Sequence, residues 1–296
     1  MIKKIVLVVI MLFIIFVSCS KEPDKTYIEE VNRVFTTDFD GLERSYYVYV
    51  PSETKAGAPL LMMLHGFGAT LEYFVEDTKL RELADRDKVI LIYPLGTPTL
   101  GFNHWDANLD FDSVDDVGFL KMLVNEMVEK YKVNENLVFV GGHSNGGFMT
   151  YTLACEANST FKAYMSVSGL MSGETWETCE ITEETNLFQF HGSADDVVPI
   201  DGTMTRFFGW GGAPPLEEML EPWINVLNDF TMIESSINEN ISVKEYISSS
   251  NHIVMFVKAE GFGHNWAKDD ELFEDQDSYS DISQLLWDYM MKFVDE

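Results

Sequence analysis

Short runs of apolar residues recur along the chain and alternate with stretches whose apolar positions have helical spacing. Residues 44–50 alternate apolar and polar side chains, as a strand does when one of its faces meets water. Six further runs are almost continuously apolar, as strands buried on both faces are: residues 59–66, 89–94, 137–142, 163–169, 186–192 and 252–259. These runs predict a central sheet.

Amphipathic helices are expected between the strands. Apolar side chains recur at helical spacing in two clear stretches: Val117, Leu120, Val124, Met127, Val128 and Tyr131, and Ile282, Leu285, Leu286, Tyr289, Met290 and Phe293. Buried strands that alternate with such helices are typical of α/β proteins. We expect a mostly parallel, twisted sheet of about eight strands with helices on both faces, and ligands beyond the carboxyl ends of the strands.

The first residues read as a targeting signal. Two lysines precede an apolar run from Ile5 to Val17, which is too short to span a bilayer comfortably but suits a secretory signal. The run ends in "FVSC", which resembles the lipobox of bacterial lipoproteins and implies cleavage before Cys19 and lipidation of its thiol. An ordinary signal peptide cut nearby is the alternative. We assign residues 1–18 to a lipoprotein signal peptide, 19–30 to a polar tether and 31–296 to one catalytic domain, anchored to a bacterial membrane at the periplasm or cell surface.

The charge and composition of the chain limit the molecules that it is expected to bind. The formal net charge of −29 repels phosphate backbones and anionic lipid, so nucleic-acid binding is excluded and the lipid anchor is the expected membrane contact. Hydrophobic residues make up 46% of the chain, which is enough for a large core. Besides Cys19, the chain has Cys155 and Cys179, and these form either a disulfide in an oxidising compartment or two buried thiols.

One short motif carries the chemistry. Residues 142–146 read Gly-His-Ser-Asn-Gly, which matches G-x-S-x-G, and they lie between a predicted strand and a predicted helix. A strand, a sharp turn and a helix around this motif form a nucleophile elbow, in which the serine backbone is strained and side chains at the flanking glycines would clash. We expect Ser144 to be an exposed nucleophile at the N-terminus of the following helix, where negative charge is favoured.

A nucleophilic serine needs a base and an acid. In α/β hydrolases the chain order is serine, acid, histidine. His264 lies in a glycine-flanked loop after the last predicted strand and is the expected base. The acid should follow an earlier strand, where Asp195 and Asp196 both qualify and Asp201 is a weaker choice.

The oxyanion of an acyl-transfer intermediate needs backbone N–H donors. Asn145, which follows the nucleophile, is one expected donor, and Phe67 in the glycine-rich loop "HGFGAT" is the other. We expect His65, Trp105, His143, Trp210 and Trp266 around the substrate, with His65 also bracing the Phe67 loop. Residues 205–230 are rich in aromatic residues, Gly and Pro and suggest a lid or substrate wall that includes Phe207 and Phe208; packing is the alternative and is favoured for Trp223.

The motifs together resemble the polyhydroxybutyrate depolymerase / feruloyl esterase-like family of α/β hydrolases. The resemblance runs through nearly the whole predicted domain, in the order "RSYYVYVPS", "PLLMMLHGFGAT", "IYPLGT", "HWDAN", "VDDVGFLKMLV", "VFVGGHSNGGFMTYTLACE", "FKAYMSVSG", "FHGSADDVVPIDG" and "GFGHNW". The family places its acid in HG-[TS]-x-D-x-x-VP and its base in G-H-x-W. On this chain those patterns select Asp195 over Asp196, and His264 with Trp266 beside it.

The resemblance implies a serine carboxylic-ester hydrolase that works without a metal or other cofactor, on feruloyl or acetyl esters of polysaccharide or on short polyesters. Two departures leave the substrate open: Phe262 precedes Gly263 where the family often has a second glycine, and Asp106 follows Trp105 where asparagine is common. A serine peptidase or acyltransferase on the same scaffold is one alternative. A catalytically inactive, lipid-anchored binding protein is another.

Overall fold

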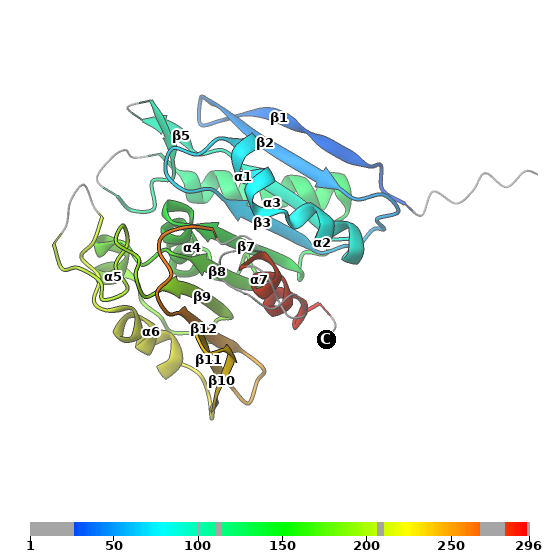
Figure 1. The fold of residues 1–296 in the computed structure, drawn as a ribbon. Coiled ribbons are helices and arrows are strands. Elements are labelled where there is room, and N and C mark those ends of the chain that lie inside the picture. Colours follow the sequence, from blue (N-terminus) through cyan, green and yellow to red (C-terminus); the bar gives the residue numbers. More distant parts are fainter. Residues whose placement is uncertain (1–26, 100, 110–113, 206–209, 267–281, 295–296) are drawn as a thin grey trace, which may run out of the picture.

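The fold is built on one large sheet. The structure, a computed structural model, describes residues 27–99, 101–109, 114–205, 210–266 and 282–294 (Figure 1). The main sheet has ten strands in the order β1-β2-β4-β3-β7-β8-β9-β12-β11-β10. Their bounds are β1 (Val31–Phe39), β2 (Leu42–Val50), β3 (Leu60–Leu64), β4 (Ile90–Pro94), β7 (Val138–His143), β8 (Ala163–Val167), β9 (Leu187–Gly192), β10 (Thr231–Asn238), β11 (Ile241–Ile247) and β12 (Ile253–Ala259). A separate two-stranded hairpin consists of β5 (Thr97–Thr99) and β6 (Phe102–His104).

The centre of the sheet is parallel and its two margins are antiparallel. All neighbouring pairs from β4 through β3, β7, β8 and β9 to β12 are parallel. The margins, β1-β2-β4 and β12-β11-β10, pair antiparallel. Parallel strands have their carboxyl ends at the same rim of the sheet, so the turns that follow β3, β7 and β9 come together there.

Helices cover both faces, as the sequence predicted. Their bounds are α1 (Leu71–Thr78), α2 (Leu80–Asp87), α3 (Asp116–Tyr131), α4 (Asn145–Glu156), α5 (Gly173–Thr178), α6 (Leu216–Asn225) and α7 (Ile282–Met291). Alternate residues of β3 show the two layers. Leu60, Met62 and Leu64 belong to a buried cluster that includes side chains of α3, α4 and α6, whereas Leu61 and Met63 belong to a second cluster with side chains of α1, α2 and α7. The continuous apolar run of this strand follows from burial on both faces.

The predicted count of about eight strands is too low. The sequence pattern indicated neither β1 nor the β10–β11 hairpin. β10 is one of the two edge strands, and its side chains are exposed or half-buried along its whole length, including Met232 and Ile233. An edge strand without a buried face has no apolar alternation to detect.

The predicted signal peptide 1–18, with Cys19 and residues 20–26 of the tether, lies outside the described residues. The last part of the tether lies against the domain: the Ile28 N–H donates to the Thr54 carbonyl at 2.7 Å, and Tyr27 pairs with Lys55. Within the described ranges, no helix is both long and apolar enough to cross a membrane.

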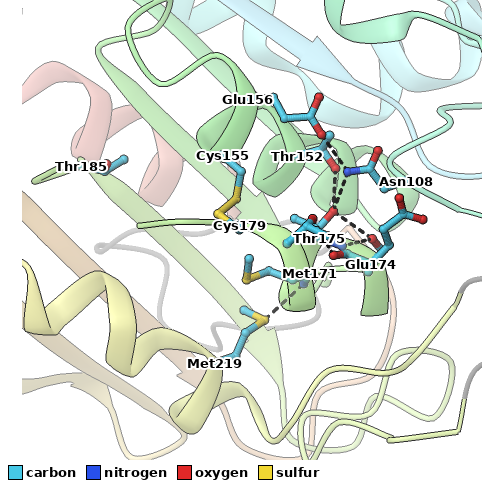
Figure 2. Close-up of a disulfide and its surroundings, with 12 residues drawn as sticks. Asn108, Thr152, Cys155, Glu156, Met171, Glu174, Thr175, Cys179, Thr185 and Met219 are labelled. Atoms are coloured by element: carbon cyan, nitrogen blue, oxygen red, sulfur yellow. Dashed lines mark hydrogen bonds between the residues drawn. A yellow bond between two sulfur atoms is a disulfide. The ribbon is translucent and has the colours of Figure 1, made fainter. Parts of the chain in front are cut away.

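A disulfide joins Cys155, near the end of α4, to Cys179, which directly follows α5 (Figure 2). Of the two states that the sequence left open for these cysteines, the structure has the bonded one. Beside it, the Asn108 amide donates to Glu156 at 2.8 Å and to Thr175 at 3.1 Å. These contacts fix the loop after β6 to the helix that follows Ser144.

Candidate active site

Ser144 lies at a strained corner between β7 and α4. Its φ is 54° and its ψ is −117°, an unfavourable backbone conformation for any residue with a side chain. A Cβ on Gly142 would lie 2.1 Å from the Gly146 carbonyl oxygen, and one on Gly146 would lie 2.1 Å from that of Leu64. Both glycines are therefore required by close backbone approach, and the serine stands at the N-terminus of α4.

Three side chains from three different strand ends form one hydrogen-bonded chain. His264 Nε2 lies 2.8 Å from Ser144 Oγ, and His264 Nδ1 lies 2.8 Å from Asp195 Oδ2. The histidine is in the loop after β12 and the aspartate in the loop after β9, so the parallel arrangement of β7, β9 and β12 brings them together. The arrangement can transfer a proton from the hydroxyl to the imidazole while the carboxylate orients the ring.

Both carboxylate oxygens of Asp195 take part in hydrogen bonds. Its Oδ1 accepts the backbone N–H groups of Val197 at 3.0 Å and Val198 at 2.8 Å. Burial alone would raise the pKa of Asp195, but the hydrogen bonds from His264 and the Val198 N–H hold that pKa below its usual value. Asp196, the neighbouring candidate, is exposed. The carboxylate that faces His264 is therefore that of Asp195.

Two further histidines in this region are kept neutral. Burial lowers the pKa of His143 to about 3, with a further contribution from His264, whose ring centroid lies 5.3 Å away. Burial also lowers the pKa of His191, whose Nε2 lies 2.8 Å from the Val198 carbonyl oxygen. His191 therefore holds the loop that carries Asp195, and the histidine in contact with Ser144 is His264.

The loop after β3 lies beside the serine. A Cβ on Gly66 would lie 3.4 Å from Ser144 Cβ, and Phe67 lines the same cavity as Ser144. Asn145, the other expected oxyanion donor, begins α4 and is completely buried. The two residues therefore flank the serine from two separate elements.

An apolar cavity opens at Ser144, with a volume of about 430 Å³. Its walls come from segments far apart in the sequence and include Phe67, Phe148, Leu170, Met171, Val198, Trp210 and Ala213. The Trp210 ring meets the Phe148 ring edge-on at 4.9 Å and the Phe67 ring at 6.5 Å between centroids. Trp210 thus lies at the cavity wall as the sequence suggested, whereas Phe207 and Phe208 lie outside the described residues.

Several residues expected around the substrate lie elsewhere. His65, Trp105 and Trp266 are 1%, 0% and 5% exposed and do not line the cavity. The Trp266 indole donates to Ser283 Oγ at 3.0 Å, so its role is to fix α7 against the loop that carries His264. His143 does not line the cavity either, because its ring packs against His264 and Trp266. The expected substrate contacts of His65, Trp105 and Trp266 are therefore corrected to structural contacts, because these side chains are buried. His143 is half-buried, and its expected contact with the substrate stays a prediction.

One exposed aromatic residue near the site was not predicted from the sequence. Phe102, on β6, is 53% exposed and stacks on Phe67, which is 45% exposed, at 5.5 Å between ring centroids. No pattern in the sequence singles out Phe102, since its proximity to the site comes from the hairpin. Among the residues that the structure describes, no group of three or more His, Cys, Asp or Glu side chains could hold a metal ion.

With this geometry established, known proteins provide a comparison. A sequence profile of the prolyl oligopeptidase family matches residues 89–192. The matched span begins at β4, includes the turn at Ser144 and ends with β9, before Asp195 and His264. It includes the cavity residues Phe148, Leu170 and Met171 but not Phe67 or Trp210, which lie before and after the matched span.

Relatives in sequence are esterases. The chain is 35% identical over 130 residues to feruloyl esterase B of Neurospora crassa, a match that covers 42% of this chain and 43% of that protein. It is 27% identical over 158 residues to a bifunctional acetylxylan esterase/xylanase of Neocallimastix patriciarum, covering 53% of this chain and 22% of that protein. The matches to these relatives span less than half of their length.

Among solved structures, an acetyl xylan esterase from Aspergillus awamori superposes with a TM-score of 0.58 at 17% identity, over 78% of this chain and 94% of that one. A thermostable esterase superposes with a TM-score of 0.54 at 15% identity, over 89% and 61%. At this identity the likeness establishes the fold alone, and the chain has the α/β-hydrolase fold. In sequence the chain is similar to feruloyl and acetylxylan esterases.

Proposed function

We propose that the chain is a serine carboxylic-ester hydrolase that acts through an acyl-enzyme. The observation that carries the proposal is the continuous hydrogen-bonded chain from Ser144 through His264 to Asp195, at the mouth of an apolar cavity. An alcohol, an imidazole and a buried carboxylate in this order are what acyl transfer by a serine requires. The esterase relatives support the same class of reaction.

In the first half-reaction, Ser144 Oγ attacks the ester carbonyl carbon while His264 Nε2 takes the hydroxyl proton. The N–H groups of Phe67 and Asn145 hold the resulting oxyanion, and the first turn of α4 adds its dipole. Collapse of this intermediate breaks the bond to the alcohol, and His264 returns its proton to the leaving oxygen. Asp195 keeps the His264 Nδ1 proton in place and stabilises the charged ring between these two events.

The second half-reaction repeats the first with water as the nucleophile. His264 takes a proton from a water molecule, which attacks the acyl carbon, and the oxyanion occupies the same site. His264 then returns the proton to Ser144 Oγ, and the carboxylic acid leaves. No step draws on a metal or an organic cofactor.

The cavity favours a bulky apolar substituent on one side of the scissile bond. A space of about 430 Å³ walled by Phe148, Met171 and Trp210 is larger than an acetyl group needs and can take an aromatic ring. Where Phe67 lines the cavity, it stacks on the exposed Phe102, and this ring pair offers a flat surface to the other substituent, such as a sugar ring. The net charge of −29 favours neutral esters. An aromatic acyl ester of polysaccharide fits these features better than an acetyl ester, and a short polyester is the next candidate.

Replacement of Ser144 by alanine tests the assignment. Ser144→Ala should lower kcat for p-nitrophenyl esters by at least about 10⁴-fold without lowering Tm, because it removes the nucleophile and no core contact. A fluorophosphonate probe should label the wild-type enzyme and not this variant. Ser159→Ala, at an exposed serine, is the matched control and should retain both activity and labelling. Hydrolysis by Ser144→Ala at the wild-type rate would refute the proposal, and a wild-type chain that fails to react with the probe would indicate an inactive binding protein.

A serine peptidase is the second candidate, and the match of residues 89–192 to the prolyl oligopeptidase family is the observation that favours it. The same three side chains serve amide hydrolysis, so the discriminating quantity is the ratio of kcat/KM for an ester and an amide with the same acyl group. We expect measurable turnover with the ester and none with the amide. The reverse ratio would move the assignment to the peptidases.

The proposed location is extracytoplasmic, with lipid attached at Cys19. The disulfide between Cys155 and Cys179 supports an oxidising compartment, since cytosolic thiols are kept reduced. Metabolic labelling with a fatty-acid analogue should tag the wild-type chain and not Cys19→Ser. Labelling of both would exclude Cys19 as the modified residue.

A further inference from the structure

The two loops that supply the proposed oxyanion donors are joined by a buried residue that neither loop contains. Phe67 lies on the loop after β3, and Asn145 begins α4. Trp105, which follows β6, is completely buried and is hydrogen-bonded to Asn145 and to His65, two residues before Phe67. It was expected at the substrate, and its contacts indicate a different part in the same reaction.

The Asn145 side chain forms two hydrogen bonds with the backbone of Trp105. Asn145 Oδ1 accepts the Trp105 N–H at 2.7 Å, and Asn145 Nδ2 donates to the Trp105 carbonyl at 3.0 Å. Both partners are fully buried, so these hydrogen bonds do not compete with water. Asn145, whose N–H is a proposed oxyanion donor, therefore uses its side-chain carboxamide to hold a second loop.

The Trp105 side chain in turn holds the Phe67 loop. Its indole Nε1 donates to the carbonyl of His65 at 3.0 Å. His65 Nδ1 lies 2.7 Å from the Gly66 carbonyl oxygen, and its Nε2 accepts the Gly96 N–H at 2.9 Å. These bonds fix the two residues directly before Phe67, so the direction of the Phe67 N–H depends on where the indole lies.

The loop that carries Trp105 is itself anchored. The Asp106 N–H donates to Asp116 Oδ2 at 2.9 Å, and Asp116 Oδ1 is paired with Arg44 at 2.7 Å, with both side chains 1% exposed. The hairpin adds a further contact, because the Gly68 N–H donates to the Asn103 carbonyl at 2.7 Å. Trp105 is thus a rigid link and not a mobile one.

We propose that Trp105 and the carboxamide of Asn145 are positioning groups that set the separation and direction of the two oxyanion donors. The inference rests on the proposed function, because it concerns the same intermediate. Donors stabilise an oxyanion only when they lie about 2.7–3.1 Å from it, and small displacements are costly in rate. The link between the loops holds both donors in place before the substrate binds, so no reorganisation is needed in the transition state.

Trp105→Phe tests the link by removing one N–H donor while it keeps most of the ring. Trp223→Phe is the matched control, since Trp223 is 2% exposed, does not line the cavity and has an indole N–H without a hydrogen-bond partner among the described residues. Rates are referred to the concentration of sites that a fluorophosphonate titrates, so that unfolded protein does not contribute. Inhibition by a boronic acid, which forms a tetrahedral adduct with the serine, reports on the oxyanion site separately.

For Trp105→Phe we expect kcat per titrated site to fall about 10-fold, KM to stay within about twofold, and the boronic acid Ki to rise by the same factor as kcat falls. Trp223→Phe should leave all three values within about twofold of wild type. Equal values for the two variants, or a boronic acid Ki that does not change while kcat falls, would overturn the proposal. Should Trp105→Phe fail to fold, Asn145→Ser, which keeps the backbone donor and loses the grip on Trp105, should give the same pattern.

These outcomes are separable from failure of the proposed function. If the wild-type chain hydrolyses no ester and binds no boronic acid, the esterase assignment fails, and the role of Trp105 fails with it. If the wild type is active and Trp105→Phe matches Trp223→Phe, only the positioning role is lost.

Discussion

The two sides of the Ser144 site differ in how their residues are held. On the side of the Trp105 link, Asn145, His65 and Trp105 are at most 1% exposed, and each makes at least two hydrogen bonds. On the cavity side, Val197 is 64% exposed and Trp210 is half-buried. On the hydrogen-bonded side, directional bonds restrict the side chains to one arrangement. On the cavity side, apolar surface is exposed and a ligand can cover it.

This difference separates two tasks. Proton transfer and oxyanion binding need atoms fixed to within a fraction of an ångström, which buried hydrogen bonds provide. Substrate choice needs area and shape, which apolar side chains provide without fixed partners. Substitutions on the hydrogen-bonded side should therefore lower the rate for every ester alike. Substitutions on the cavity side should lower it for some esters more than for others.

The largest effect is expected at Asp195, which belongs with the hydrogen-bonded side because its buried carboxylate is bonded to His264 and to two backbone N–H groups. Asp195→Asn should lower kcat by about 10⁴-fold for both short and bulky esters, because the amide no longer accepts the His264 Nδ1 proton in the productive tautomer. Asp196→Asn, at the exposed neighbour, should leave kcat unchanged. Steady-state kinetics on an acetyl and an aromatic acyl ester measure both variants. A loss confined to one ester would contradict the separation of tasks.

An intermediate effect, on stability, is expected at His65. Burial lowers the pKa of His65 from 6.5 to about 4, so at mildly acidic pH the unfolded chain binds a proton that the folded chain does not. The free energy of unfolding should therefore fall as pH drops through this window, by up to about 1.4 kcal/mol per pH unit from this residue. His65→Gln should reduce that slope between about pH 6 and about pH 4.5 in urea titrations. Equal slopes for wild type and variant would show that His65 titrates alike in both states.

The smallest effect is expected on the cavity side. Trp210→Ala removes a wall of the cavity and should lower kcat/KM about 10-fold for an aromatic acyl ester, mainly through KM, while the acetyl ester changes little. Phe230→Ala, at an aromatic residue that is 41% exposed and does not line the cavity, controls for general loss of aromatic surface. An equal loss of kcat/KM for both esters would show that Trp210 supports the reaction itself and does not select the substrate.

Much of this arrangement could be predicted from the sequence because its signals are local. The apolar run at residues 59–66 became β3 (Leu60–Leu64), and the run at 137–142 became β7 (Val138–His143). The turn at Ser144 follows from the two glycines, whose spacing is set by backbone contact. Chain order and the position of loops after strands pointed to His264 and left Asp195 and Asp196 open, and the resemblance to a known family selected Asp195. The structure brings Asp195 and His264 into hydrogen-bond contact.

The rest depends on which segments meet, and no local pattern encodes that. The cavity wall combines Phe67, Phe148, Met171 and Trp210 from four separate elements or loops. Phe102 reaches the site only because its hairpin is hydrogen-bonded to the Phe67 loop. Trp105 and His65 were placed at the substrate because they lie in motifs, yet their polar atoms are used inside the protein. β10 escaped detection since it has no buried face.

The entry point of the chain has a consequence for how a surface-bound enzyme would meet a large substrate. Tyr27 pairs with Lys55, just before the amino end of β3, whereas Ser144 follows the carboxyl end of the neighbouring β7. The two points therefore lie at opposite rims of the sheet. If lipid is attached at Cys19, as proposed above, the tether therefore joins the domain at the rim opposite the mouth of the cavity, and that mouth stays open to a large substrate.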